Sequence, residues 1–219
     1  MDLSNPIATV FPSLDGDVLT VLARTTRPLT GRQVAELAHR GSQSGVRLTL
    51  LRLEEQGLVL ADSAGRSMLY RANRDHLLWA ALEPLLHTAE SAVPLLQERI
   101  VDVASSALGA QAASATTIAL FGSVARGTGT PASDIDLVVV LPDFVTDESG
   151  QAAIEQISQA VLGWTGNDCN VFTAKRELLR NMVTSDDPMI ESWRGDAVTF
   201  NGPELRELIE SMSSSHHLR

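Results

Sequence analysis

Two aspartates two positions apart are the residues of this chain best suited to chemistry. Asp134 and Asp136 open an apolar run that extends to Leu141 and has the composition of a buried strand. Because successive side chains of a strand point to opposite faces, both carboxylates emerge on the same face. Neighbouring carboxylates repel each other, which favours a hard divalent cation such as Mg2+, and this metal typically takes one or two carboxylates together with substrate phosphate oxygens. We therefore expect Asp134 and Asp136 to bind Mg2+.

The segment before this pair predicts a phosphate-binding turn. Residues 117–121 are apolar and predict a strand, and Gly122 and Ser123 follow it directly. A glycine lets the backbone approach a phosphate without a Cβ in the way, while Ser123 and amides at the start of a short helix can donate to phosphate oxygens. A plainer alternative is a buried strand whose two aspartates cap a neighbouring helix.

Together the two segments carry an extended motif. Residues 117–127 read TIALFGSVARG and residues 133–140 read SDIDLVVV. They resemble the DNA polymerase β nucleotidyltransferase superfamily, of the minimal type, whose signature is Gly-Ser at a strand end and an acid-x-acid pair about ten residues later. The resemblance implies in-line attack on the α-phosphorus of a nucleoside triphosphate, with pyrophosphate leaving. It assigns the catalytic and metal-binding roles to Asp134 and Asp136. It assigns nucleotide binding to Gly122, Ser123, Arg126 and Ser133.

A third carboxylate of the superfamily is missing. Active members place it on a later strand, matched here to residues 169–172, where Asn170 occupies that place. An amide coordinates through its oxygen but neither neutralises a second cation nor accepts a proton at neutral pH. Asp168 lies on the same face but about 6.6 Å back along the strand, so it substitutes only if the strand bends or bulges. Whether the site still catalyses is therefore open.

The first third of the chain predicts three helices followed by a hairpin. Helices are expected over residues 14–22, from residue 31 to near Gly41, and from residue 43 until Gly57 ends the third. Ser13 and Ser42 are the expected N-caps of the first and third, and Thr30 and Gln33 form a capping box on the second. Two short strands, residues 58–60 and 67–71, are expected around a turn at residues 62–65.

This order of elements resembles the winged-helix repressor families over residues 13–73. The segments that carry the resemblance are GRQVAELA (31–38), LLRLEEQGLV (50–59) and YRAN (70–73). The resemblance implies binding to double-stranded DNA, with the third helix in the major groove. Base edges would meet Gln43, Ser44 and Arg47. Phosphates would meet Arg52 and Arg66. The alternative is a protein-interaction module whose arginines are ordinary solvated charges.

Between the two motif regions lies a tract rich in leucine and alanine. Residues 76–108 place apolar side chains at helical intervals, and Pro84 and Pro94 are expected to kink or divide the helix. Its apolar face can cover the second domain, a second copy of the chain, or both. Because helix-turn-helix proteins commonly bind paired half-sites, we expect a homodimer. His76 and His87 lack a paired ligand set and are given no chemistry.

Length and pattern together predict a two-domain fold of the α/β (α+β) class. We expect a winged helix-turn-helix domain over residues 1–75, a helical connector over 76–110 and a nucleotidyltransferase-like mixed sheet with flanking helices over 111–219. Further elements are expected as helices over residues 152–162 and 176–182, strands over 169–172 and 197–200, and a last helix opening at Gly202-Pro203.

Charge and cysteine usage limit the possible settings. The net charge of −10 is concentrated in residues 76–219, which hold eight basic and nineteen acidic residues, whereas residues 1–75 hold nine arginines against eight acids. A near-neutral, arginine-bearing first part is compatible with DNA binding. Cys169 is the only cysteine, so no intramolecular disulfide forms. No signal peptide opens the chain, and no apolar stretch reaches the roughly 20 residues of a membrane span. These features predict a cytoplasmic protein.

Two functions of different classes follow. In the first, a DNA-binding transcriptional regulator senses a nucleoside triphosphate in its second domain and reorients its winged helices through the connector. In the second, an active nucleotidyltransferase modifies a protein, a small molecule or an RNA end, and the winged helix selects the target or represses its own operon. Asn170 favours the first, whereas the intact Asp134 and Asp136 keep the second open.

Overall fold

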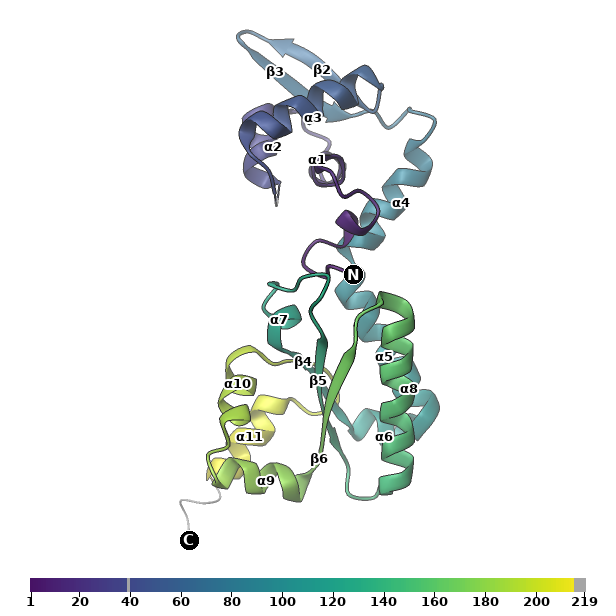
Figure 1. Ribbon diagram of the computed structural model, residues 1–219, viewed down its shortest axis with the longest axis vertical. Coiled ribbons are helices and arrows are strands. Elements are labelled where there is room, and N and C mark those ends of the chain that lie inside the picture. The colour runs from purple at the N-terminus through teal and green to yellow at the C-terminus, as the bar shows by residue number, and fades with distance from the viewer. Residues whose placement is uncertain (39, 215–219) are drawn as a thin grey trace. The chain divides into compact units, whose positions relative to one another are not determined.

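The computed structural model describes residues 1–38 and 40–214, which form a mixed α+β fold with eleven α-helices and two sheets. The chain divides into two compact units (Figure 1). The N-terminal unit is Asn5–Ala92, and the C-terminal unit combines Met1–Ser4 with Val93–Arg219, of which residues 215–219 lie outside the described ranges. Among the described helices, none is both long and apolar enough to cross a membrane.

The N-terminal unit contains the three helices and the hairpin expected from the sequence. Its helices are α1 (Leu14–Ala23), α2 (Gly31–Leu37), α3 (Gln43–Glu55) and α4 (Trp79–Glu90), preceded by the 3-10 helix η1 (Pro6–Thr9). Its sheet has the order β1-β3-β2, all antiparallel, with β1 (Leu29–Thr30), β2 (Val59–Ala64) and β3 (Ser67–Ala72). The hairpin turn is tighter than expected because pairing continues to Ala64 opposite Ser67, and Gly65 turns the chain with a φ of +61°.

Side-chain caps fix where the short helices begin. Thr30 and Gln33 form the expected capping box on α2, and the Ser42 hydroxyl accepts from the Gly45 amide at 3.1 Å at the start of α3. Ser13 stands at the N-cap of α1, but its hydroxyl bonds to the Asp15 carboxylate instead of a backbone amide. The structure therefore confirms two of the three expected caps.

One apolar core holds this unit together. It is built from fully buried side chains of the first three helices, including Val18, Leu22, Val34, Val46 and Leu50. Trp79 and Leu86 of α4 belong to the same core. Part of the apolar face expected to pair with a second copy is therefore covered within the unit itself.

The predicted connector is split between the units. Its first helix, α4, belongs to the N-terminal unit, and α5 (Ala92–Leu108) lies almost wholly in the C-terminal unit. Pro84 sits inside α4 without dividing it, and the break comes at Ser91. Pro94 falls in the first turn of α5, where its missing amide has no intrahelical partner to lose.

A four-stranded mixed sheet organises the C-terminal unit, in the order β6-β5-β4-β7. β4 (Thr117–Phe121) pairs antiparallel with β5 (Ile135–Leu141) and with β7 (Val198–Asn201), and β5 pairs parallel with β6 (Cys169–Lys175). The parallel pair requires a crossover, which α8 (Asp147–Thr165) supplies. Because β5 has a neighbour on each side, Leu137 to Leu141 are all buried.

Helices cover both faces of this sheet (Figure 1). α9 (Arg176–Thr184), α10 (Pro188–Asp196) and α11 (Leu205–Ser214) pack on one face around Trp193. α5, α6 (Ala110–Ala115) and α8 lie on the other. The sequence did not predict α6, which has six residues, or α10, whose apolar side chains show no clear helical period. α10 nevertheless begins with strong signals: Asp187 caps it and Pro188 is its first residue.

Candidate active site

Three side chains meet where β5 and β6 begin. Asn170 pairs with Asp136 in the β5–β6 register, and its Nδ2 donates to Asp134 Oδ2 at 3.0 Å and to Asp136 Oδ1 at 3.4 Å. Because one amide contacts both carboxylates, the two aspartates project to the same face, as their spacing predicts. Asp134 is exposed just before the strand, and Asp136 is half-buried on it.

Gly122 closes the site from the side of β4. It follows Phe121, which pairs with Asp136 across the antiparallel ladder, and it begins the short helix α7 (Gly122–Ala125) with a φ of +72°. A Cβ at this position would lie 2.4 Å from Asp136 Oδ2. Position 122 therefore requires glycine for two reasons: its backbone is left-handed, and the Asp136 carboxylate lies where a Cβ would be.

Burial makes the negative charge on Asp136 costly. It raises the pKa of this carboxyl above its ordinary value, whereas the hydrogen bond from Asn170 acts in the opposite direction. The charges of Asp134 and Asp196 raise the pKa further, and Arg126 lowers it. A bound cation would remove this cost, because it neutralises the two neighbouring carboxylates directly.

The residues present fit one hard divalent cation. Carboxylate and amide oxygens are the donors that Mg2+ prefers. Asn170 presents its nitrogen to the aspartates, so the amide must rotate to turn its oxygen toward a cation. Within the described ranges, no three side chains of His, Cys, Asp or Glu cluster as metal ligands. The site thus offers two carboxylates and one amide.

Asp168 does not take the third place in this arrangement. Pairing of β5 with β6 runs in continuous register from Cys169 to Lys175, so this ladder lacks the bulge that would shift Asp168 toward the pair. The backbone carbonyl of Asp168 accepts from the Ile135 amide at 2.8 Å, and its side chain is exposed. Asn170 is therefore the β6 side chain that contacts Asp134 and Asp136.

The remaining predicted nucleotide-binding residues have different local roles. The hydroxyl of Ser123 makes no hydrogen bond to any described residue and is half-buried beside Gly122. Ser133 Oγ accepts from the Thr130 amide at 2.9 Å and so closes the turn before Asp134. Arg126, directly after α7, donates to the Asp196 carboxylate. Ser123 is the most available donor of the three, and Ser133 shapes the loop.

The sequence profile of the family described as the nucleotidyltransferase domain matches residues 107–169. This stretch holds β4, Gly122, β5 and both aspartates, and it ends one residue before Asn170. Residues 107–169 of the C-terminal unit therefore match the nucleotidyltransferase domain. No curated protein matches the sequence.

Solved structures are similar to part of this chain at low identity. One is a crystal structure of a toxin–antitoxin with AMP-PNP, 20% identical, covering 56% of this chain and 86% of that chain with a TM-score of 0.36. Another holds a tri-AMPylated HEPN toxin from Shewanella oneidensis in complex with the MNT antitoxin, 18% identical, covering 57% and 87% with a TM-score of 0.33.

Two residues that support the candidate site had no role in the sequence prediction. Buried Asn167 donates from Nδ2 to the Ser133 carbonyl at 2.8 Å and to the Pro131 carbonyl at 3.3 Å, which fixes the turn leading into Asp134. Asp196 binds Arg126 from the end of α10. The only sequence signal for Asn167 is its place after Gly166, the αL cap of α8. Asp196 has none, since α10 itself was not anticipated.

Cys169 neighbours the site without taking part in it. Burial raises the pKa of its thiol to about 11. The thiol therefore stays protonated at neutral pH and is a poor nucleophile or metal ligand.

In the N-terminal unit, three of the five residues predicted to bind DNA line one hollow of about 510 Å³. Gln43, Ser44 and Arg47 contribute from α3, while residues of α2 and β3 form the other walls. Arg66 lies outside this hollow, in the exposed turn between β2 and β3. Arg52 forms an ion pair with Asp15.

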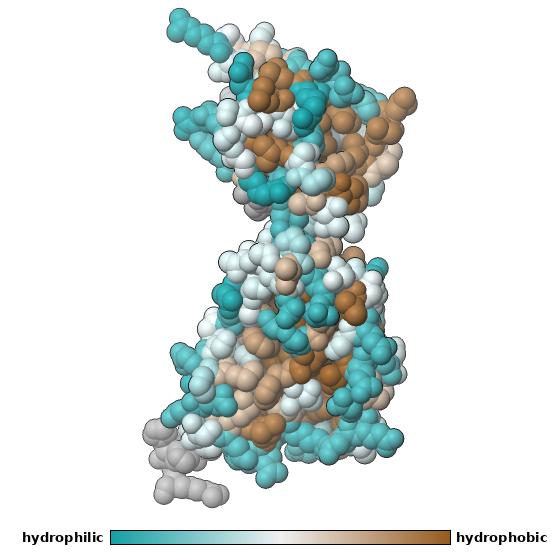
Figure 2. All heavy atoms as spheres, in the orientation of Figure 1, coloured by the Kyte–Doolittle hydropathy of each residue, from teal (hydrophilic) through white to brown (hydrophobic). Residues whose placement is uncertain are grey.

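Ion pairing separates the arginines of this unit into two groups. Six of its nine arginines pair with carboxylates, at Arg24, Arg32, Arg40, Arg52, Arg71 and Arg74. Arg27, Arg47 and Arg66 pair with no described residue. The unpaired positive charge therefore includes two of the predicted DNA contacts. Apolar side chains are also exposed on this unit, Leu48 and Leu51 of α3 among them, and Figure 2 shows such apolar surface between polar groups.

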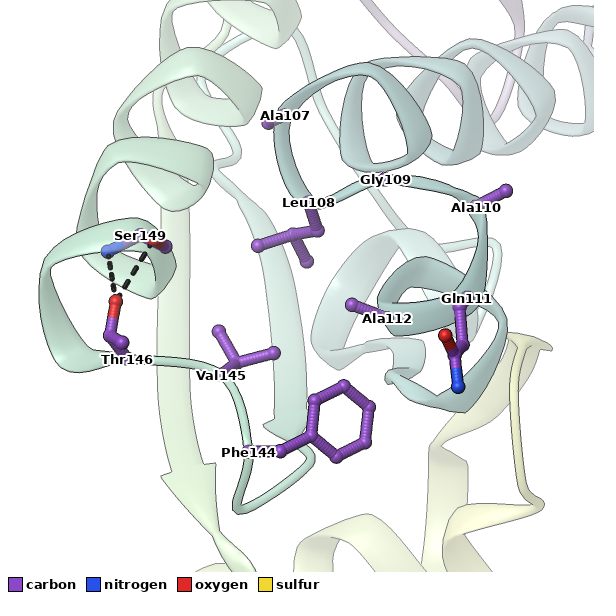
Figure 3. Close-up of a pocket in the computed structure, with 10 residues that line it drawn as sticks. All are labelled: Ala107, Leu108, Gly109, Ala110, Gln111, Ala112, Phe144, Val145, Thr146 and Ser149. Atoms are coloured by element: carbon purple, nitrogen blue, oxygen red, sulfur yellow. Dashed lines mark hydrogen bonds between the residues drawn. The ribbon is translucent and has the colours of Figure 1, made fainter.

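A further hollow of about 420 Å³ lies at the opposite end of β5 from Asp134 (Figure 3). Its walls are mainly apolar, with Leu108, Phe144 and Val145 around it, and no charged side chain lines it. Thr146 and Ser149, two of its polar residues, bond to each other at the start of α8, and Gln111 adds a side-chain amide. This hollow carries no acid–base or metal chemistry.

Proposed function

We propose that the nucleotidyltransferase domain binds a Mg2+–nucleoside triphosphate at Asp134, Asp136 and Gly122, and transfers the nucleoside monophosphate to a hydroxyl of a protein, an RNA end or a small molecule. The observation that carries the proposal is the contact of the Asn170 amide with both aspartates, which places two carboxylates side by side next to a glycine turn. Mg2+ would neutralise these carboxylates and the triphosphate.

Each of these residues would have its own role in the transfer. Ser123, with its free hydroxyl, donates to a phosphate oxygen, and the Asp134–Asp136 face orients the α-phosphate. The acceptor oxygen forms a bond to the α-phosphorus, the bond to the bridging oxygen breaks, and pyrophosphate leaves with the electron pair. The acceptor hydroxyl also loses a proton, which a base in the site must take.

Asn170 limits this last step. Its amide accepts no proton at neutral pH and adds no negative charge for a second cation. Asp134 and Asp136 would both be engaged by the cation, so the site offers no further carboxylate to accept the proton. We infer that nucleotide affinity is retained while turnover is low, so that the domain serves as a slow transferase or a nucleotide sensor.

Two separate measurements test this function. Purified protein is incubated with Mg2+ and each labelled nucleoside triphosphate in turn, and bound nucleotide and released pyrophosphate are quantified independently. We expect Mg2+-dependent binding of at least one nucleotide and slow pyrophosphate release. Asp134→Ala combined with Asp136→Ala is the matched control, and it abolishes both signals. Absence of binding by the wild-type protein would contradict the proposal.

We propose as a second function that the N-terminal unit is a winged-helix domain that binds double-stranded DNA in the cytoplasm and regulates transcription as a homodimer. The observation that favours it is the hollow lined by Gln43, Ser44 and Arg47, beside which Arg47 and Arg66 carry unpaired positive charge. Phosphates bind guanidinium groups through charge and N–H donors, and neither of these two arginines has a carboxylate partner among the described residues. A nucleotide bound to the C-terminal unit would then alter DNA binding through the segment that joins the two units.

A further inference from the structure

An ion pair stands beside the two aspartates. Arg126 follows α7, and its Nη1 donates to Oδ2 of Asp196, the last residue of α10. Phe121 pairs with Asp136 across the β4–β5 ladder, and α7, which Arg126 follows, begins at the next residue, so the ion pair lies on the segment that carries Gly122. α10 contacts both α7 and β4. Trp193, one turn before Asp196, packs edge-on against Phe121 with ring centroids 6.1 Å apart.

The two partners are buried to different degrees. Asp196 exposes only 14% of its side chain, whereas Arg126 exposes 52%. The second carboxylate oxygen of Asp196, Oδ1, is buried and has no hydrogen-bond partner among the described residues. Arg126 is thus the group that compensates a largely buried charge. Withdrawing the guanidinium would leave that charge unpaired, which is strongly unfavourable.

The Arg126 guanidinium keeps further N–H donors that the ion pair with Asp196 does not use. Arginine carries five N–H groups in a rigid fork, and the ion pair uses the Nη1 side. The remaining donors belong to a half-exposed side chain directly after α7, the helix that Gly122 begins. The Asp196 carboxylate at the end of α10 sets the position of these donors. α10 is in turn held next to β4 by the contact of Trp193 with Phe121, the residue before Gly122.

We propose that Asp196 is a positioning residue that holds Arg126 ready to bind the triphosphate of the nucleotide. The inference rests on the proposed nucleotide-binding function and adds a residue to it. Asp196 acts only through Arg126: it touches neither phosphate nor metal. Its contribution is to keep the guanidinium in one orientation before the nucleotide arrives, so that less side-chain entropy is lost on binding.

A double-mutant cycle tests this dependence. Affinities for Mg2+ with inorganic tripolyphosphate, and with each nucleoside triphosphate, are measured by calorimetry for the wild type, Arg126→Ala, Asp196→Ala and the double variant. We expect each single variant to bind about tenfold more weakly, and the double variant to bind no more weakly than Arg126→Ala. Asp196→Asn, which keeps an acceptor oxygen, should recover part of the loss. Asp147→Ala removes the carboxylate of the Lys175 ion pair at the far end of β6, and should leave affinity unchanged.

Different results would contradict the role of Asp196 and the proposed nucleotide binding. If Asp196→Ala weakens binding as much in the Arg126→Ala background as in the wild type, Asp196 supports the fold in general and the inference is wrong. If Asp196→Ala tightens binding, Asp196 repels the triphosphate, which also overturns it. If the wild type binds none of these ligands, the proposed function fails and the inference falls with it.

Discussion

The α-carbon of Gly122 faces the carboxylate of Asp136 so closely that an added Cβ would lie 2.4 Å from Oδ2. The glycine turn and the acidic pair therefore form one unit, although fourteen positions separate them in the sequence. A site built in this way tolerates no side chain at the turn.

Gly122→Ala should consequently damage both stability and nucleotide binding. Gly166 has nearly the same φ, +73°, with nothing within 4 Å of an added Cβ, so Gly166→Ala measures the backbone strain alone. We expect that control to cost about 1 kcal/mol, and Gly122→Ala to cost about 1–3 kcal/mol more because the carboxylate must move. Nucleotide affinity should fall at least about tenfold for Gly122→Ala only. Equal effects of the two substitutions would show that the Asp136 contact is unimportant.

Asp136→Asn should stabilise the protein at neutral pH. Because burial raises the folded-state pKa of Asp136 above its unfolded value, the free energy of unfolding decreases as pH rises between the two values, and the whole penalty is present at pH 7. The variant lacks this charge, so its melting temperature in EDTA should exceed that of the wild type at pH 7. The difference should shrink as pH falls through the same window. A variant less stable than the wild type at pH 7 would contradict this assignment.

DNA binding should depend on the unpaired arginines. We expect Arg47→Ala and Arg66→Ala each to cost about 1–3 kcal/mol of affinity for a selected duplex and to reduce its salt slope by about one. Arg52→Ala is the informative comparison, because Arg52 is already paired with Asp15 and should change affinity less. Fluorescence anisotropy over a salt series measures all three. The proposed interface is wrong if neither Arg47→Ala nor Arg66→Ala weakens any complex.

Self-association should depend on the connector, where Leu77 is 96% exposed and Leu78 is 59% exposed. We expect light scattering to give twice the chain mass of 23.5 kDa at micromolar concentration. Leu77→Ser combined with Leu78→Ser should produce a monomer, because it removes exposed apolar area from this face. The same change at Leu48 and Leu51, exposed leucines of α3, should leave the mass unchanged. A wild-type monomer would end the dimer proposal and leave the connector helices as intrachain braces.

Local patterns in the sequence predicted much of the fold and the two aspartates, because helix caps, strand alternation and the glycine turn are properties of neighbouring residues. The capping box at Thr30 and the β5 strand are examples. Contacts between distant residues were not predictable in the same way. The Arg126–Asp196 pair joins positions 70 apart through a helix that shows no clear period, and the Arg52–Asp15 pair joins positions 37 apart. Each joins an arginine to a carboxylate that no local pattern connects with it.

The most direct test of the account compares wild type with Asn170→Asp. Asn170 contacts both aspartates in the place where the resemblance expects a third carboxylate. Restoring that charge should leave nucleotide affinity within about threefold and raise Mg2+-dependent pyrophosphate release at least about tenfold, equivalent to roughly 1.4 kcal/mol in the barrier. If the wild type already turns over rapidly and Asn170→Asp is neutral or harmful, another group supplies the missing function and Asn170 does not limit catalysis.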